Sequence, residues 1–264
     1  MSRQPSATAC FSFDNMGEAA DIGAGRLDGP RPSGADPSLA VGYPKLFDLL
    51  ERRRIRASFF VEGWNGENHP EAVREIVRRG HELGMHGWLH EPWAELEPAR
   101  EVVLARRATE ALERAAGARP VGFRAPGGAR SAATEEILLD LGYAYDASLG
   151  EGSSPGRLSA GLAQVPFVWA GVDGAYYLRP DPPEPAEVRD LWLAALRKTA
   201  DEGGLFLLIG HAFLTGVEDA RLDALDAVME AASRDTRIEV HTVGEVASAL
   251  PVPATSPPTH TAHP

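Results

Sequence analysis

Three histidines lie within ten residues of the sequence, in the stretch HELGMHGWLH that runs from position 81 to position 90. His86 and His90 are four residues apart, so a helix or helical turn would place both imidazole rings on one side, a geometry suited to holding one divalent cation. The alternative is one exposed histidine and one core histidine. His81 is expected only to pack or to hydrogen-bond locally.

Three further residues could do chemistry beside such a cation. Asp14 follows the apolar run ACFSF directly and could act as a general base on a water molecule, or simply cap a turn. His211 follows the apolar run LFLLIG, and its alternative is a hydrogen-bonded core histidine. Arg124, in RAPGG, needs an anionic partner if it is buried, and a carboxylate of the site is the natural one.

Strand-like and helix-like segments alternate along most of the chain, which is typical of a mostly parallel sheet. Seven or eight such units in about 240 residues favour a distorted (β/α) barrel of about seven strands over an open sheet. Strands are expected at 9–13, 56–63, 82–86, 122–126, 143–148, 164–169, 205–211 and 238–243. Helices are expected at 43–54, 70–80, 97–116, 134–141, 185–203 and 218–233.

The polar residues that could do chemistry share one position, because each stands at the carboxyl end of an expected strand. They are Asp14, His86, Arg124, Asp146 and His211. In a barrel of parallel strands these ends meet on one face, and barrel enzymes assemble their active sites there. The fold therefore predicts that these five side chains lie close together.

Composition excludes several classes of partner. The 264-residue chain has 38 acidic residues against 26 Lys and Arg, a net charge of -12, which repels nucleic acid and anionic membranes. No stretch approaches the ~20 apolar residues of a membrane-spanning helix. With the single cysteine Cys10 and no signal-like apolar run near the start, we expect a cytoplasmic protein. Residues 1–250 are expected to form a single domain, and the Pro/Thr-rich residues 251–264 a disordered tail.

In this order and at this spacing, these stretches resemble the polysaccharide deacetylases of carbohydrate esterase family 4. The matching motifs are SFDN (12–15), GHELG (80–84) with the two histidines after it, RAPGG (124–128), DAS (146–148) and LIGH (208–211). The resemblance spans about residues 9 to 245. It implies a distorted barrel that hydrolyses an N-acetyl amide with the help of a divalent metal, zinc first, with cobalt, nickel and iron as alternatives.

The resemblance also implies a role for each matching residue. Asp14 would be the general base, and His211 would be the general acid that protonates the departing amine. Arg124 would orient Asp14, and Asp146 would tune His211. An acid and a base on opposite sides of the amide suit this chemistry, because amides have poor leaving groups.

By the same resemblance, His86 and His90 would be metal ligands, and the third ligand is where this sequence departs from the family. The family's second aspartate is Asn15 here. An amide oxygen is neutral and a weaker donor than a carboxylate. Three outcomes are open: Asn15 ligates weakly, Asp14 or Glu18 completes the coordination, or the metal is lost.

Within the family, HGWLHEPW (86–93) resembles the cytoplasmic branch, which includes allantoinase-like and cyclic-imide hydrolases. The leading hypothesis is a deacetylase acting on an N-acylated amino sugar or sugar-like small metabolite. The alternatives are an imide or ureide ring hydrolase and a catalytically silent binding protein. Trp88, Trp93 and Trp169 could stack on a sugar ring or pack inside the protein. Pairing into a homodimer is left open.

Overall fold

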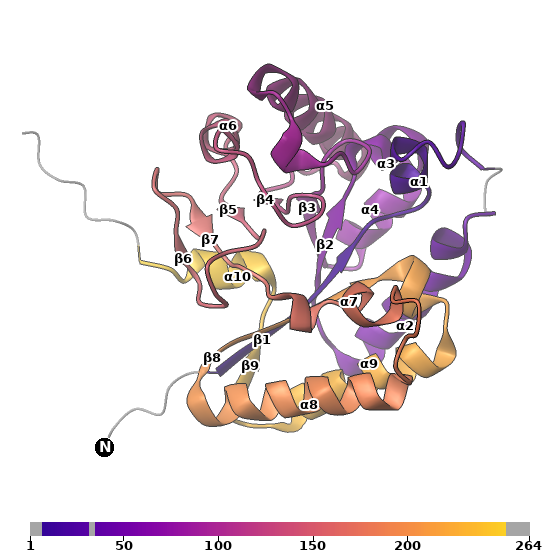
Figure 1. The fold of residues 1–264 in the computed structure, drawn as a ribbon, viewed down its shortest axis with the longest axis vertical. Helices are drawn as coiled ribbons and strands as arrows, with labels where there is room; N and C mark the ends of the chain where they lie inside the picture. Colours follow the sequence, from indigo (N-terminus) through magenta and orange to yellow (C-terminus); the bar gives the residue numbers. More distant parts are fainter. Residues whose placement is uncertain (1–6, 32–34, 252–264) are drawn as a thin grey trace, which may run out of the picture.

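The computed structural model describes residues 7–31 and 35–251 (Figure 1). Within these residues, nine strands form one curled mixed sheet, ordered β6-β7-β5-β4-β3-β2-β1-β8, with β9 also paired to β1. Of the nine strands in the described residues, only β6 and β7 pair antiparallel, so the expected α/β distorted barrel is confirmed in the form of a half-barrel. The strands are β1 (Ala7–Asp14), β2 (Ser58–Val61), β3 (Glu82–Met85), β4 (Gly122–Phe123), β5 (Tyr145–Asp146), β6 (Gly156–Arg157), β7 (Ala163–Gln164), β8 (Gly204–His211) and β9 (Ile238–Val240).

Helices connect the strands and begin where the sequence provides start signals. Proline occupies the first turn of α4, α5 and α8, where its missing N–H costs nothing, and α8 has a capping box between Glu184 and Glu187. The α-helices are α1 (Ala19–Gly23), α2 (Tyr43–Arg53), α3 (Gly63–Asn68), α4 (Pro70–Arg78), α5 (Pro98–Ala116), α6 (Thr134–Asp140), α7 (Gly174–Tyr177), α8 (Pro185–Glu202), α9 (Asp219–Arg234) and α10 (Val243–Ser248). Shorter helical turns are η1 (Ser38–Gly42), η2 (Trp93–Glu95), η3 (Trp169–Gly171) and η4 (Ala212–Gly216).

The central strand β1 sets the register of the site. Nearly all its residues are buried, as expected of an apolar strand with neighbours on both sides. It pairs with β8 over its whole length, and this register places Asp14 beside His211. On the other side, Asp14 lies beside Phe60 of β2. Backbone pairing alone therefore places the candidate base, Asp14, next to the candidate acid, His211.

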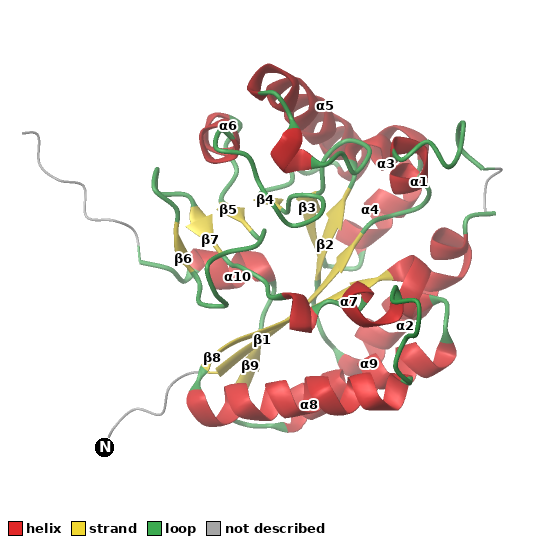
Figure 2. Cartoon of the chain, in the orientation of Figure 1, coloured by secondary structure: helices red, strands yellow, loops and turns green. Residues whose placement is uncertain are grey.

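Strands β4, β5 and β7 are much shorter than the sequence predicts, and β6, between β5 and β7 in the chain, is equally short. Each has only two residues, and Figure 2 shows that this part of the chain is mostly loop. The strand expected at 164–169 ends after Gln164, and Pro166 cannot donate to a ladder. Phe167 forms only an isolated bridge with Leu149. Strand β6 lies where the sequence analysis expects neither a strand nor a helix.

The helices cover the outside of the curled sheet. Helices α8 and α9 pack against each other along the side formed by β1, β8 and β9, at the bottom of Figure 1. Helix α5 packs against α3 and α4 at the top of the same view. In the described part of the chain, no helix is both long enough and apolar enough to cross a membrane. The tail expected to be disordered lies outside the described residues beyond residue 251.

Candidate active site

The two histidines of the opening motif come together through a tight turn. Strand β3 ends at Met85, and the chain then turns with Gly87 at φ 74° and His90 at φ 62°. The His86 and His90 rings have centroids 5.0 Å apart and planes at 69°. The spacing of four therefore does bring the rings together, but in a loop with left-handed residues and not on a helix.

Both rings are held in the neutral form that can bind a metal. Nδ1 of His86 donates to the carbonyl oxygen of Arg124 at 2.8 Å, which leaves Nε2 for a ligand. Burial lowers the pKa of His86 to about 3. Burial also lowers the pKa of His90. Neutral imidazole is the ligating species, so these environments favour coordination near pH 7.

Asp14 lies at the end of β1, buried and paired with an arginine. Nη1 of Arg124 donates to Oδ1 of Asp14 at 2.7 Å and to Oγ of Ser12 at 2.8 Å. The guanidinium also lies 4.1 Å above the Phe60 ring. Burial alone would raise the pKa of Asp14, but the charge and hydrogen bond of Arg124, together with the charges of His86 and His211, outweigh it and hold this pKa below its ordinary value. The expected contact is present, and Asp14 is ionised at neutral pH.

His211 is paired with a carboxylate that the sequence did not single out. Oδ1 of Asp173 accepts from Nδ1 of His211 at 2.5 Å, and Oδ2 accepts from the His211 backbone N–H at 2.8 Å. The Thr215 hydroxyl also donates to Oδ2, at 2.5 Å. Burial alone would lower the pKa of His211, but the Asp173 charge and hydrogen bond raise it above its ordinary value. A protonated imidazole with Nε2 free is the form that a general acid requires.

Asp146 does not take the position beside His211 that the sequence led us to expect. Its carboxylate accepts from the Ser148 hydroxyl at 2.6 Å and from Nη1 of Arg130 at 2.9 Å. The sheet order explains this, because four strands separate β5 from β8. Within the described residues, the carboxylate that contacts His211 is that of Asp173.

The sequence around Asp173 does not mark this residue as part of a site. It lies in the segment WAGVDG, which has no strand pattern long enough to mark a strand end. Its position comes from an isolated bridge between Val172 and Ile209 of β8, after which the Asp173 N–H donates to the carbonyl oxygen of Ile209 at 3.0 Å. A single bridge of this kind cannot be read from periodicity.

The candidate groups face one cavity of about 250 Å³, which they share with a largely apolar wall. Its polar lining residues are Asp14, His86, His90, Arg124 and His211. Its larger apolar lining residues are Phe167, Trp169, Val172, Leu178 and Ile209. His90, His211 and Leu178 also line a second cavity of about 600 Å³, and Asn15 lines this second cavity as well. The two cavities therefore meet at the candidate metal ligand and the candidate acid.

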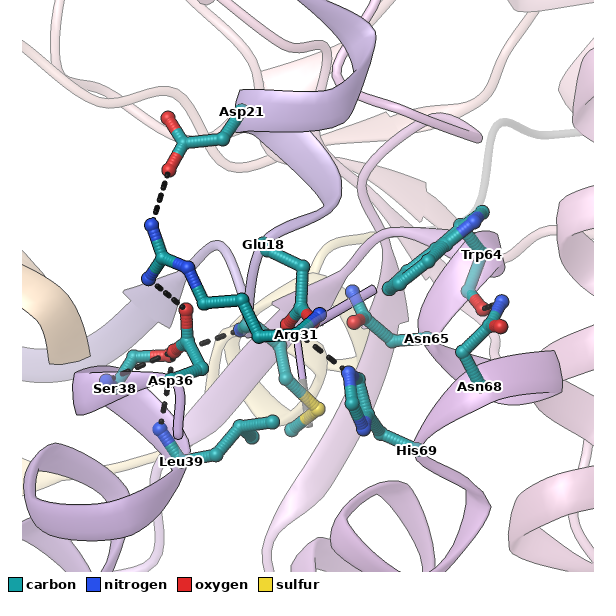
Figure 3. Close-up of polar contacts among 12 residues, drawn as sticks. Glu18, Asp21, Arg31, Asp36, Ser38, Leu39, Trp64, Asn65, Asn68 and His69 are labelled. Atoms are coloured by element: carbon teal, nitrogen blue, oxygen red, sulfur yellow. Dashed lines mark hydrogen bonds and ion pairs between the residues drawn. The ribbon is translucent and has the colours of Figure 1, made fainter. Parts of the chain in front are cut away.

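The residues present fit a divalent cation held by His86, His90 and the amide oxygen of Asn15. Oδ1 of Asn15 is buried and has no hydrogen-bond partner in the structure, as a ligand oxygen would. Glu18 is not available as a replacement, because its carboxylate accepts from the Arg31 N–H and from Nε2 of His69 (Figure 3). Across residues 7–31 and 35–251, no group of three or more His, Cys, Asp and Glu side chains is arranged around one point. The candidate ligand set therefore differs from one made of His, Cys, Asp and Glu alone, because its third member is the neutral side-chain amide of Asn15.

His86→Ala is expected to weaken zinc binding by more than about 100-fold. The reason is that it removes one of two imidazole ligands. Loss of a residue that only hydrogen-bonds to a metal ligand costs up to about 100-fold, and loss of a ligand itself should cost more. Zinc affinity measured by competition with a chromophoric chelator tests this. His81→Ala is the matched control, because that ring stacks on Phe47 away from the cavity and its loss leaves the ligands in place. Unchanged affinity in His86→Ala would remove His86 from the ligand set.

Known proteins resemble this chain over part of its length. Residues 28–145 match the family model described as polysaccharide deacetylase. Over 109 residues, the chain is 34% identical to the peptidoglycan deacetylase of Helicobacter pylori, and this match spans 41% of the chain and only 37% of that protein. The fold is also similar to that of the Puue allantoinase, with a TM-score of 0.76 and 18% identity over 94% of this chain and 93% of that one.

One likeness extends over nearly the whole chain. The crystal structure of a Mycobacterium smegmatis protein described as a polysaccharide deacetylase superimposes with a TM-score of 0.85 and 30% identity, covering 97% of this chain and 96% of that one. Because sequence identity at this level accompanies the same fold across almost all of both chains, this protein belongs to the polysaccharide deacetylase family.

Proposed function

We propose that this protein removes the acetyl group from an N-acetylated amino sugar or sugar-like metabolite by metal-assisted hydrolysis. The observation that carries the proposal is the pairing of an ionised base with a protonatable acid in one cavity. The charge of Arg124 helps to lower the pKa of Asp14, and the charge and hydrogen bond of Asp173 raise the pKa of His211. Both line the cavity that contains the two ligand histidines. A protein that only bound its ligand would not need these opposed pKa shifts.

The residues divide the proton transfers between them. A bound divalent cation would polarise the amide carbonyl and lower the pKa of a water molecule toward neutral. Asp14 would take the proton from the attacking water, and Arg124 would keep the carboxylate ionised and oriented. His211 would give its Nε2 proton to the departing nitrogen, which would otherwise leave as an unstable amide anion. Asp173 would orient the His211 ring and stabilise its protonated form, so that the Nε2 proton is available for this transfer.

The second cavity favours a hydroxyl-rich substrate. Its wall contains donors and acceptors of both charges, namely Asp21, Arg26, Arg31, Asp36 and Glu91. Mixed donors and acceptors suit sugar hydroxyls, which both donate and accept. Of the three tryptophans that could stack on a sugar, Trp93 and Trp88 are buried, while Trp169 is 51% exposed and lines the catalytic cavity. Trp169 is therefore the platform available to a pyranose ring.

Trp169→Ala is expected to raise KM about 3- to 10-fold with little change in kcat, because stacking of ~0.5–1.5 kcal/mol is made equally in the ground and transition states. Steady-state kinetics on an N-acetylated disaccharide would measure it. Val168→Ala is the control, since Val168 is similarly exposed but does not line the cavity. A fall in kcat with KM unchanged would show that Trp169 does not serve as a binding platform.

The proposed reaction is tested by the products formed from a panel of substrates. We expect the zinc-loaded protein to release free acetate from N-acetylglucosamine, chitooligosaccharides or N-acetylated peptidoglycan fragments. Cyclic imides and ureides belong in the same panel, because ring opening consumes substrate without releasing acetate. Ring opening without acetate release would replace the deacetylase proposal with the ring hydrolase. Binding of these ligands without turnover would favour a silent binding protein.

A further inference from the structure

The turn that follows β1 is held in an unusual conformation. Asn15 has φ 62°, in the left-handed region that few residues other than glycine adopt. Its carbonyl oxygen accepts from the Tyr43 hydroxyl at 3.0 Å. The next two N–H groups donate to side chains, Met16 to Oε2 of Glu62 at 3.0 Å and Gly17 to Oγ of Ser38 at 2.9 Å. Three consecutive backbone groups are thus fixed by side chains from other elements.

Of the three side chains that hold this turn, that of Glu62 is the most buried. It follows the last residue of β2, at the same edge of the sheet as Asp14, and is fully buried. Its Oε2 also accepts from the Asn65 side-chain amide at 3.1 Å. Burial raises the pKa of Glu62 to about 8. A buried polar group without water to compete for its bonds fixes its partners firmly.

The other side of the turn has a polar support of its own. Asp36 accepts from the backbone and hydroxyl of Ser38 and from Nη1 of Arg31 (Figure 3). Glu18 accepts from the Arg31 backbone and from His69 (Figure 3). These bonds secure the Ser38 side of the turn. Among the residues that the structure describes, Glu62 is the one whose side chain accepts the N–H of Met16, the residue that directly follows Asn15.

Left-handed residues that are held by the surrounding structure gather at functional sites, where the conformation aims a side chain. Asn15 is buried, its Oδ1 is unpartnered, and it lines the same cavity as His90. We propose that Glu62 is a positioning residue: by accepting the Met16 N–H, it holds Asn15 in the left-handed conformation and aims the Asn15 amide oxygen at the cation beside His86 and His90. The inference rests on the proposed metal site and explains how a neutral amide serves there.

Zinc affinity of the purified full chain, measured by chelator competition, tests this without any assay of activity. Glu62→Met keeps the approximate shape but removes the acceptor, and it is expected to weaken zinc binding about 10- to 100-fold, as outer-shell losses do. Glu62→Gln retains an acceptor oxygen and nearly the same shape, so it should recover most of the affinity. The pair Glu101→Met and Glu101→Gln is the control, because Glu101 is also fully buried and hydrogen-bonded, but its partners are Trp93, Ser131 and Thr134.

A double-mutant cycle separates positioning from a general loss of stability. If Glu62 acts through Asn15, then Glu62→Met should cause no further loss of zinc affinity when Asn15 is already alanine. The inference would be overturned if the losses of zinc affinity from Glu62→Met and Asn15→Ala multiplied in the double mutant. Wild-type zinc affinity in Glu62→Met alone would overturn it as well. Should Glu62→Met fail to fold, Tyr43→Phe removes only the bond to the Asn15 carbonyl, and unchanged affinity there would overturn it too. A wild-type protein that binds no zinc overturns both this inference and the metal site, whereas zinc binding without acetate release overturns only the proposed reaction.

Discussion

Asp14→Asn is expected to lower kcat by about 10²- to 10⁴-fold, the range that general acid–base groups contribute. An amide cannot take the proton of the attacking water, although it keeps the shape of the carboxylate. Arg124 Nη1 would lose a charged partner but could still donate to the amide oxygen and to Ser12, so we expect the fold to persist. Initial rates of acetate release at saturating substrate would measure the loss.

Two comparisons make that result interpretable. Zinc content should be retained in Asp14→Asn, because the two histidines and Asn15 remain. Asp146→Asn removes the carboxylate of another buried aspartate paired with an arginine, the half-buried Arg130 at 2.9 Å, but Asp146 does not line the cavity that contains Asp14 and His211. Its kcat should fall much less. If Asp14→Asn keeps most of its rate while binding zinc normally, the base must be sought elsewhere.

Asp173→Asn is expected to lower kcat about 10²-fold or more and to move the basic limb of the pH–rate profile to lower pH. Asp173 raises the pKa of His211, and a general acid works only while protonated, so activity is lost as pH rises through that pKa. Removing the charge lowers the pKa, and the loss then begins at lower pH. An asparagine also cannot accept all three bonds that Asp173 receives.

The pH dependence of kcat/KM distinguishes a lowered pKa of His211 in Asp173→Asn from simple destabilisation of the protein. Asp146→Asn is again the control, because Asp146 contacts Ser148 and Arg130 and not His211. Its basic limb should stay where the wild-type limb lies. The same displacement in both variants, or in neither, would mean that Asp173 does not set the protonation of His211.

The sequence predicted best what backbone pairing and long apolar runs determine. Strands β1 and β8 are long, buried and bounded by a polar residue, so the ends at Asp14 and His211 were readable and the register brings them level. The contact between Arg124 and Asp14 followed from the cost of burying an unpaired guanidinium. The same reasoning could not decide whether a helix or a turn carries His86 and His90, because both bring residues four apart together.

The parts that the sequence did not reveal depend on contacts between irregular segments. Asp173 reaches His211 through a single bridge between Val172 and β8, and Glu62 reaches the Asn15 turn across 46 residues of sequence. Neither contact leaves a periodic pattern. The prediction that Asp146 contacts His211 was wrong although Asp146 does end a strand. That strand, β5, is separated from β8 by four other strands. Strand ends indicate which edge of the sheet a residue occupies, and only the strand order decides its neighbours.

The most direct test of the account is acetate release by chelator-treated protein as zinc is added back, with an N-acetylated chitooligosaccharide as substrate. The account predicts no release without metal and a rate that rises to a plateau near one equivalent of zinc per chain. It also predicts that Asp14→Asn, loaded with the same zinc, stays near the baseline. Acetate release at the full rate without metal, or none at full zinc occupancy across the substrate panel, would contradict the central claim that this site is a metal-assisted N-deacetylase.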